Sequence, residues 1–160
     1  MSDADKRLAI ARRHHRHQRY AEAVAVCQDS LRHHPDHGET WQLLGMALYQ
    51  QGKYQDSEQC YRRMLAIAAN NDANNGSAYN NLGVVLKAQG HYDQAKAAYQ
   101  QAIALSPDSP LAYNNLGNLY SQQQEFTQAK EYFQLAVDRA PGDLNYRLSL
   151  ANALRDGGEY

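Results

Sequence analysis

Apolar residues recur along this chain with the spacing of one face of an α-helix. Trp41 is followed by Leu44 at three residues and Leu48 at seven, and the same pattern returns at Tyr79 and at Tyr113. Residues at i, i+3, i+4 and i+7 share one face of a helix. Each set therefore predicts a helix with one buried stripe.

A second apolar stripe follows each first one after a short turn. In one copy, Gly90 marks the turn, Tyr92, Ala95 and Tyr99 form the stripe, and Pro107 follows. Proline cannot continue a helix, so the second helix is expected to end before it. The six letters AYNNLG at 78–83 return at 112–117. The pattern predicts a helix–turn–helix unit that repeats at this interval.

This unit resembles the tetratricopeptide repeat (TPR), which is about 34 residues long and has the pattern W-x₂-L-G-x₂-Y…A-x₃-F…P. The resemblance implies an all-α fold, an α-solenoid of stacked antiparallel helix pairs in a right-handed superhelix, with about nine helices. We expect a single TPR array over residues 1–160. Its repeats are predicted at 4–37, 38–75, 76–109 and 110–143, with a partial fifth repeat or capping helix at 144–160.

The second repeat is longer than the others by four residues. The interval from Trp41 to Tyr79 exceeds the interval from Tyr79 to Tyr113, and the excess lies in the segment AANNDANNGS at 68–77. One extra helical turn or an Asn-rich loop would absorb it, and either would change the stacking at that junction. Gly158 is in phase with Gly52, where a second helix begins. We therefore expect a fragment of a longer protein, or alternatively a natural end with a capping helix.

Composition and charge narrow the function classes. The net charge of −1 gives no basis for general attraction to nucleic acid or a membrane, and no apolar run is long enough for a membrane span or a secretory signal. Cys27 and Cys60 lack metal or redox spacing and are expected to be buried and reduced in a cytoplasmic protein. No catalytic or cofactor-binding motif is present, so we expect no enzyme activity and no cofactor.

Six of the seven histidines lie in residues 1–37. They fall at opposite ends of the first predicted hairpin, which argues against one shared metal site. The alternatives are solvated side chains, a weak metal site, or a patch with the nearby arginines for an anionic partner. The six are His14, His15, His17, His33, His34 and His37.

The resemblance implies that the first helices line a concave groove. Off the packing stripe they carry amides and a few apolar side chains, which suit an extended peptide because an amide offers both donors and an acceptor. The candidate groove residues are Asn80, Asn81, Lys87, Asn114, Asn115, Asn118, Ser149, Asn152, Met46 and Tyr49.

Asn81 and Asn115 also resemble the asparagine ladder of the O-GlcNAc transferase TPR superhelix, which holds polypeptides by their backbone. Leu43 and Ser149 stand at equivalent places and do not match that ladder. The alternative is that these asparagines are solvated or join neighbouring helices. Both interpretations stay open from the residues alone.

The sequence thus predicts a non-catalytic protein–protein interaction module that binds an extended peptide or a partner helix in the concave groove, within a larger protein. One alternative is a self-associating scaffold that forms a homo-oligomer. A second is the substrate-recognition domain of a larger enzyme, such as a glycosyltransferase. The expected partner is a protein or peptide, with no nucleic acid and no membrane.

Overall fold

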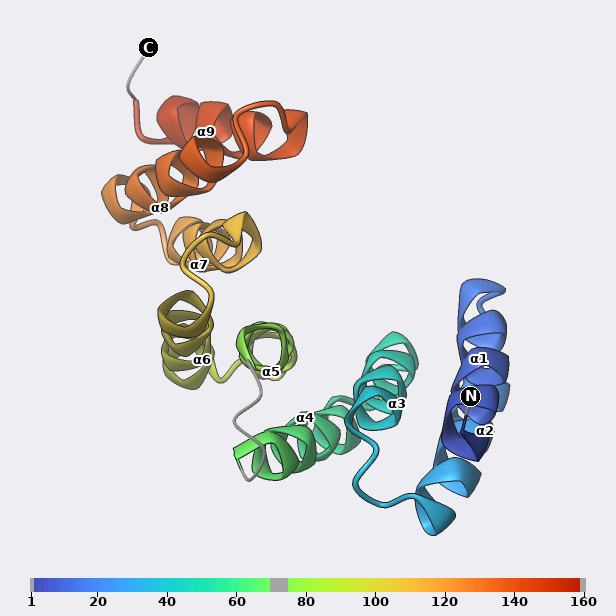
Figure 1. Ribbon diagram of the computed structural model, residues 1–160. Coiled ribbons are helices and arrows are strands. Elements are labelled where there is room, and N and C mark those ends of the chain that lie inside the picture. The colour runs from blue at the N-terminus through green and yellow to red at the C-terminus, as the bar shows by residue number, and fades with distance from the viewer. Residues whose placement is uncertain (1, 70–74, 159–160) are drawn as a thin grey trace.

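The chain forms an all-α array of helices. The computed structural model describes residues 2–69 and 75–158, and within these ranges it contains nine α-helices and no strand (Figure 1). The helices are α1 (Asp3–Arg16), α2 (Tyr20–His33), α3 (Gly38–Gln50), α4 (Tyr54–Ala69), α5 (Gly76–Ala88), α6 (Tyr92–Leu105), α7 (Pro110–Gln122), α8 (Phe126–Arg139) and α9 (Leu144–Asp156).

Each helix packs on the helix that follows it, and the pairs stack in chain order. The stack bends into an open curve with α1 and α2 at one end and α8 and α9 at the other (Figure 1). In that view α3 and α5 lie on the inner side of the curve and α4 and α6 on the outer side. The predicted all-α fold of stacked antiparallel helix pairs is confirmed.

Glycine on the first helix of a repeat allows the two helices of that repeat to approach closely. A Cβ atom added to Gly83 would lie 2.6 Å from the ring of Tyr99, and one added to Gly117 would lie 2.8 Å from the ring of Phe133. Such distances are below van der Waals contact, so a side chain there would displace the ring. This contact explains why glycine recurs inside helices, where it costs about 1 kcal/mol relative to alanine.

The turns between first and second helices use left-handed backbone. Gly52 and Gly90 have φ values of +74° and +79°. At the matching places in the first and fourth repeats, Gln18 and Gln124 have φ values of +59° and +63°. The turn at Gln124 therefore keeps the geometry of the glycine turns, although glutamine adopts left-handed backbone less readily than glycine.

The longer second repeat changes the stacking beside it. Helix α4 has 16 residues, whereas α6 has 14, so part of the extra length extends the second helix. The rest of the predicted insertion, at 70–74, lies outside the described residues. Helix α1 contacts α3, α5 contacts α7 and α7 contacts α9, but α3 and α5 make no comparable contact among the described residues. The array is thus opened between α3 and α5 on its inner side.

Candidate peptide-binding groove

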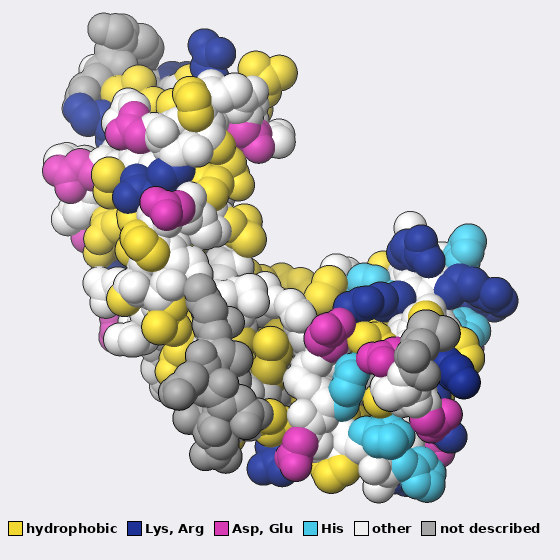
Figure 2. Space-filling model, in the orientation of Figure 1, with side chains coloured by type: hydrophobic (Ala, Val, Ile, Leu, Met, Phe, Trp, Pro, Cys, Tyr) yellow, Lys and Arg dark blue, Asp and Glu magenta, His cyan; other side chains and the backbone are white. Residues whose placement is uncertain are grey.

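The inner side of the curve is a hollowed surface. Figure 2 shows the hollow between the arm made by α1 and α2 and the arm made by α7 to α9. It also shows that Lys, Arg and His side chains gather on the α1–α2 arm. Two pockets lie in this region, one between α1 and α3 and one between α3 and α5. The first helices therefore supply the lining of both.

The pocket between α1 and α3 has a volume of about 490 Å³ and combines charge with apolar surface. Arg12 Nη2 donates to Glu39 Oε2 at 2.6 Å, and this pair joins the two helices at the pocket wall. Leu43 and Met46 supply apolar lining, and Met46 is 39% exposed. An exposed thioether adapts its shape to a ligand because its side chain has several rotatable bonds.

His15 forms another part of this pocket. Its ring contacts Tyr20 edge-on with centroids 5.3 Å apart, and burial lowers the pKa of its imidazole. The lowered pKa keeps the ring neutral at pH 7, because a buried site disfavours the charged form. Arg12 and Arg16 therefore supply the positive charge of the pocket at neutral pH.

The pocket between α3 and α5 lies where the two first helices separate. It has a volume of about 110 Å³ and is lined by Met46, Tyr49, Asn81, Val84 and other residues of α3, α4 and α5. Apolar side chains form most of this lining, and the half-buried Asn81 adds an amide to it. Small pockets of this kind suit one apolar side chain held by a few polar contacts.

Asn80 and Asn115 join two neighbouring first helices. Asn115 Nδ2 donates to Asn80 Oδ1 at 2.9 Å, from α7 to α5. Asn80 is only 5% exposed, so this contact satisfies a buried acceptor. Two of the predicted groove residues thus have a structural contact, as the interhelical interpretation of the asparagines expects.

The equivalent pair in the next repeat is incomplete. Asn114 holds the place of Asn80 one repeat later, and Ser149 holds the place of Asn115. Asn114 Oδ1 is buried without a hydrogen-bond partner among the described residues. Ser149 Oγ instead donates to the backbone oxygen of Asn145 at 3.0 Å, within its own helix.

The other predicted groove residues are half-buried on the first helices. Asn118 of α7 and Asn152 of α9 make no side-chain hydrogen bond within the ranges described above, and Lys87 of α5 makes no ion pair there. Their polar groups are therefore free to meet a ligand. Sequence reasoning left Arg12 and Glu39 out of the site, although both helices carry them on the predicted groove face.

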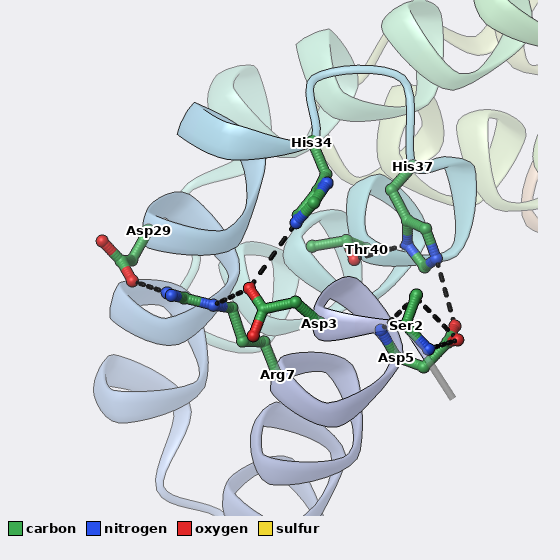
Figure 3. Close-up of polar contacts among 8 residues, drawn as sticks. All are labelled: Ser2, Asp3, Asp5, Arg7, Asp29, His34, His37 and Thr40. Carbon is green, nitrogen blue, oxygen red and sulfur yellow. Dashed lines mark hydrogen bonds and ion pairs between the residues drawn. The ribbon is translucent and has the colours of Figure 1, made fainter.

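His34 and His37, which lie between α2 and α3, link the start of α1 to the segment before α3 (Figure 3). His34 Nε2 lies 3.6 Å from Asp3 Oδ2, and His37 Nε2 lies 3.5 Å from Asp5 Oδ1. His37 Nδ1 also contacts Thr40 Oγ1 at 2.8 Å. No group of three potential metal ligands occurs among the described residues.

The N-terminal end of α1 is fixed by the same cluster (Figure 3). Ser2 caps the helix, because its Oγ accepts from the backbone N–H of Asp5 at 3.1 Å, while Asp5 Oδ2 accepts from the backbone N–H of Ser2 at 2.8 Å. Arg7 donates to Asp3 at 2.8 Å and also pairs with Asp29 of α2. These contacts hold the first repeat together and do not form a ligand site.

The two cysteines are unreactive by position. Cys27 and Cys60 are buried and free, as expected. Burial raises the pKa of both thiols to about 12, so neither is a thiolate nucleophile at neutral pH. Among the described helices none combines the length and the apolar character that crossing a bilayer requires.

Comparison with known proteins agrees with this architecture. Tetratricopeptide repeat profiles match residues 36–108, 80–144 and 117–160. No curated protein matches the sequence. The solved structure of MamA from Desulfovibrio magneticus RS-1, covering its residues from 41 to the end, is 25% identical with a TM-score of 0.81; the match covers 99% of this chain and 88% of that one.

Two further solved structures share the fold. PilF of Pseudomonas aeruginosa is 22% identical with a TM-score of 0.85, over 98% of this chain and 70% of that chain. A chain of the Cut9–Hcn1 hetero-tetramer of APC/C is 17% identical with a TM-score of 0.85, over 94% of this chain and 30% of that chain. At these identities the likeness concerns the arrangement of helices.

Proposed function

Since the chain belongs to the tetratricopeptide repeat family, whose domains mediate protein binding, we propose that it is a non-catalytic interaction module that binds an extended peptide of a partner protein in its concave groove. The observation that carries this proposal is the pair of pockets on the inner side, which share Met46. A peptide that follows the groove would meet both pockets in succession.

The two pockets suit different parts of such a peptide. The pocket between α3 and α5 takes one apolar side chain against Met46, Tyr49 and Val84. Asn81 borders that pocket, where its amide can donate to a peptide carbonyl and accept from a peptide N–H. Each such neutral hydrogen bond adds about 0.5–1.5 kcal/mol, so the apolar anchor supplies most of the affinity.

Fewer asparagines are available for ladder-like binding of a peptide backbone than the sequence of this chain suggests. Asn115 donates to Asn80, so only Asn81 of the two ladder positions has its whole amide free for a peptide. We therefore assign the backbone contact to Asn81, with Asn118 and Asn152 extending the amide surface toward α9.

Peptides selected from a displayed random library test the proposal. Affinity of a selected peptide is measured by calorimetry for the wild type, for Asn81→Ala and for Gln100→Ala, an exposed amide on the outer helix α6. We expect Asn81→Ala to weaken binding about fivefold with an unchanged Tm, because one or two hydrogen bonds are lost. Equal affinity of both variants, or weakening by Gln100→Ala alone, would contradict the concave site.

A further inference from the structure

The pocket between α1 and α3 carries positive charge at places where the other repeats are neutral. Arg12 and Arg16 of α1 both line this pocket. Uncharged residues hold the equivalent places in α3, α5 and α7: Gln50, Ala88 and Gln122 for Arg16, and Met46, Val84 and Asn118 for Arg12. Packing of a first helix therefore does not require a cation at either place.

The two arginines differ in what they contact. Arg12 Nη2 donates to Glu39 Oε2 at 2.6 Å, whereas Arg16 is exposed and makes no ion pair or side-chain hydrogen bond within the part of the chain that the structure describes. His15 is kept neutral at pH 7 by the burial that lowers its pKa. Two cations and one carboxylate thus line the pocket, and the excess charge belongs to Arg16.

Apolar surface adjoins this charge in the same pocket. Leu43 is buried and Met46 is exposed, and both line the pocket with Arg16. A glutamate side chain matches this combination, because its methylene groups can lie on Leu43 and Met46 while its carboxylate accepts two N–H groups of a guanidinium. A chain terminus matches it less well, since its carboxylate is attached directly to the last Cα.

We propose that the peptide bound in the concave groove carries an internal glutamate whose carboxylate pairs with Arg16 in the pocket between α1 and α3. The proposal rests on the peptide binding proposed above and adds the charge that the peptide must carry. Met46 lines both this pocket and the pocket between α3 and α5. The glutamate and the apolar anchor therefore lie within a few residues of each other along the peptide.

A matched pair of peptides tests the proposal. A peptide that binds the wild type is selected from a displayed random library and synthesised with an amidated C-terminus. One form retains its glutamate and the other carries glutamine in its place, so the two differ only in one carboxylate. Their affinities for the whole 160-residue protein are measured by fluorescence anisotropy.

Two variants of α1 separate the pocket from the general charge of the arm. Arg16→Gln removes the free guanidinium of the pocket. Arg13→Gln removes the same charge from the same last turn of α1, but Arg13 is exposed and does not line the pocket. Both are surface changes and should leave Tm unchanged.

We expect the glutamate form to bind the wild type about fivefold more tightly than the glutamine form, as for one partly exposed ion pair. Arg16→Gln should remove this preference by weakening the glutamate form alone, because the two changes delete the same contact. Arg13→Gln should retain the preference to within about twofold, since only long-range attraction is lost.

Four results would overturn the proposal while peptide binding in the groove stands. They are selected peptides that lack an acidic residue, equal affinity of the two forms for the wild type, equal effects of Arg16→Gln and Arg13→Gln, and binding that needs a free C-terminal carboxylate. In each case Met46→Glu would still weaken binding. Failure to select any peptide, or binding that Met46→Glu leaves unchanged, would overturn the proposed function and this proposal with it.

Discussion

Asn115 of α7 donates a 2.9 Å hydrogen bond to the buried amide oxygen of Asn80 on α5, and so links two successive first helices of the array. Each of these helices carries an Asn-Asn pair, and the contact gives a structural role to one asparagine of each pair. It also separates the asparagines that stabilise the stack from those that remain available in the groove.

Removing the donor of this bond should destabilise the protein. Asn115→Ala leaves the Asn80 oxygen buried without a partner, and we expect a loss of about 1–3 kcal/mol in the free energy of unfolding. Asn118→Ala on the same helix is the matched control and should change stability by less than about 0.5 kcal/mol. Urea denaturation of the two variants measures both values. Equal stability would show that the bond contributes nothing.

Completing the unmatched pair one repeat later should have the opposite effect. Ser149→Asn places an amide where it can donate to Asn114 Oδ1, which lacks a partner among the described residues. We expect a gain of about 1 kcal/mol, or a Tm raised by about 2–4 °C for a chain of this size. A Tm that stays constant or falls in calorimetric scans would contradict the equivalence of the two pairs.

The close contact between Gly83 and Tyr99 gives a third prediction. Gly83→Ala puts a methyl group 2.6 Å from the ring and should cost about 1–3 kcal/mol, although alanine favours helices. Gly38→Ala is the control, because a Cβ there meets nothing within 4 Å. It should be neutral or slightly stabilising in the same unfolding assay. A neutral Gly83→Ala would mean that the helices of a repeat can separate freely.

Burial of His15 predicts a loss of stability on acidification. Its folded-state pKa is lowered, so as the pH falls through about 6.5 the unfolded chain takes up the proton first and the folded state loses relative stability. The lowered pKa values of Asp3 and Asp5, caused mainly by hydrogen bonds from Arg7 and Ser2, act in the same direction but only near and below pH 4.

Thermal scans between pH 7.5 and 5 isolate the histidine. His15→Phe keeps an aromatic ring against Tyr20 and removes the titrating group, so its Tm should fall less over this range than that of the wild type. Parallel curves for the two proteins would rule out His15 as the cause.

Much of the fold could be predicted from the apolar stripes, because packing requires the same residues in every repeat. Leu82, Leu86 and Leu116 are buried at the places that the periodicity indicates. The lengthened second repeat was also evident in the spacing. The way α3 and α5 separate could not be predicted, since it depends on how the extra residues divide between helix and loop.

The candidate site was less predictable for a related reason. A helical wheel places Asn80 and Asn81 on the same polar side of α5. The rotation between successive repeats directs Asn80 toward α7, whereas Asn81 lies beside the pocket between α3 and α5. That rotation follows from packing across the whole stack. The return of the Asn-Asn pair in the next first helix, which places Asn115 one position beyond the equivalent of Asn80, was the one signal in the sequence that could have indicated the bond.

We propose that the concave groove binds peptide through the apolar pockets that share Met46. The affinity of a selected peptide for Met46→Glu, compared with its affinity for Leu135→Glu in the groove between α8 and α9, tests this proposal most directly. Because Met46 is exposed, its replacement should leave Tm unchanged and weaken peptide binding about tenfold or more, while Leu135→Glu has no effect. Undiminished affinity of Met46→Glu would contradict the account.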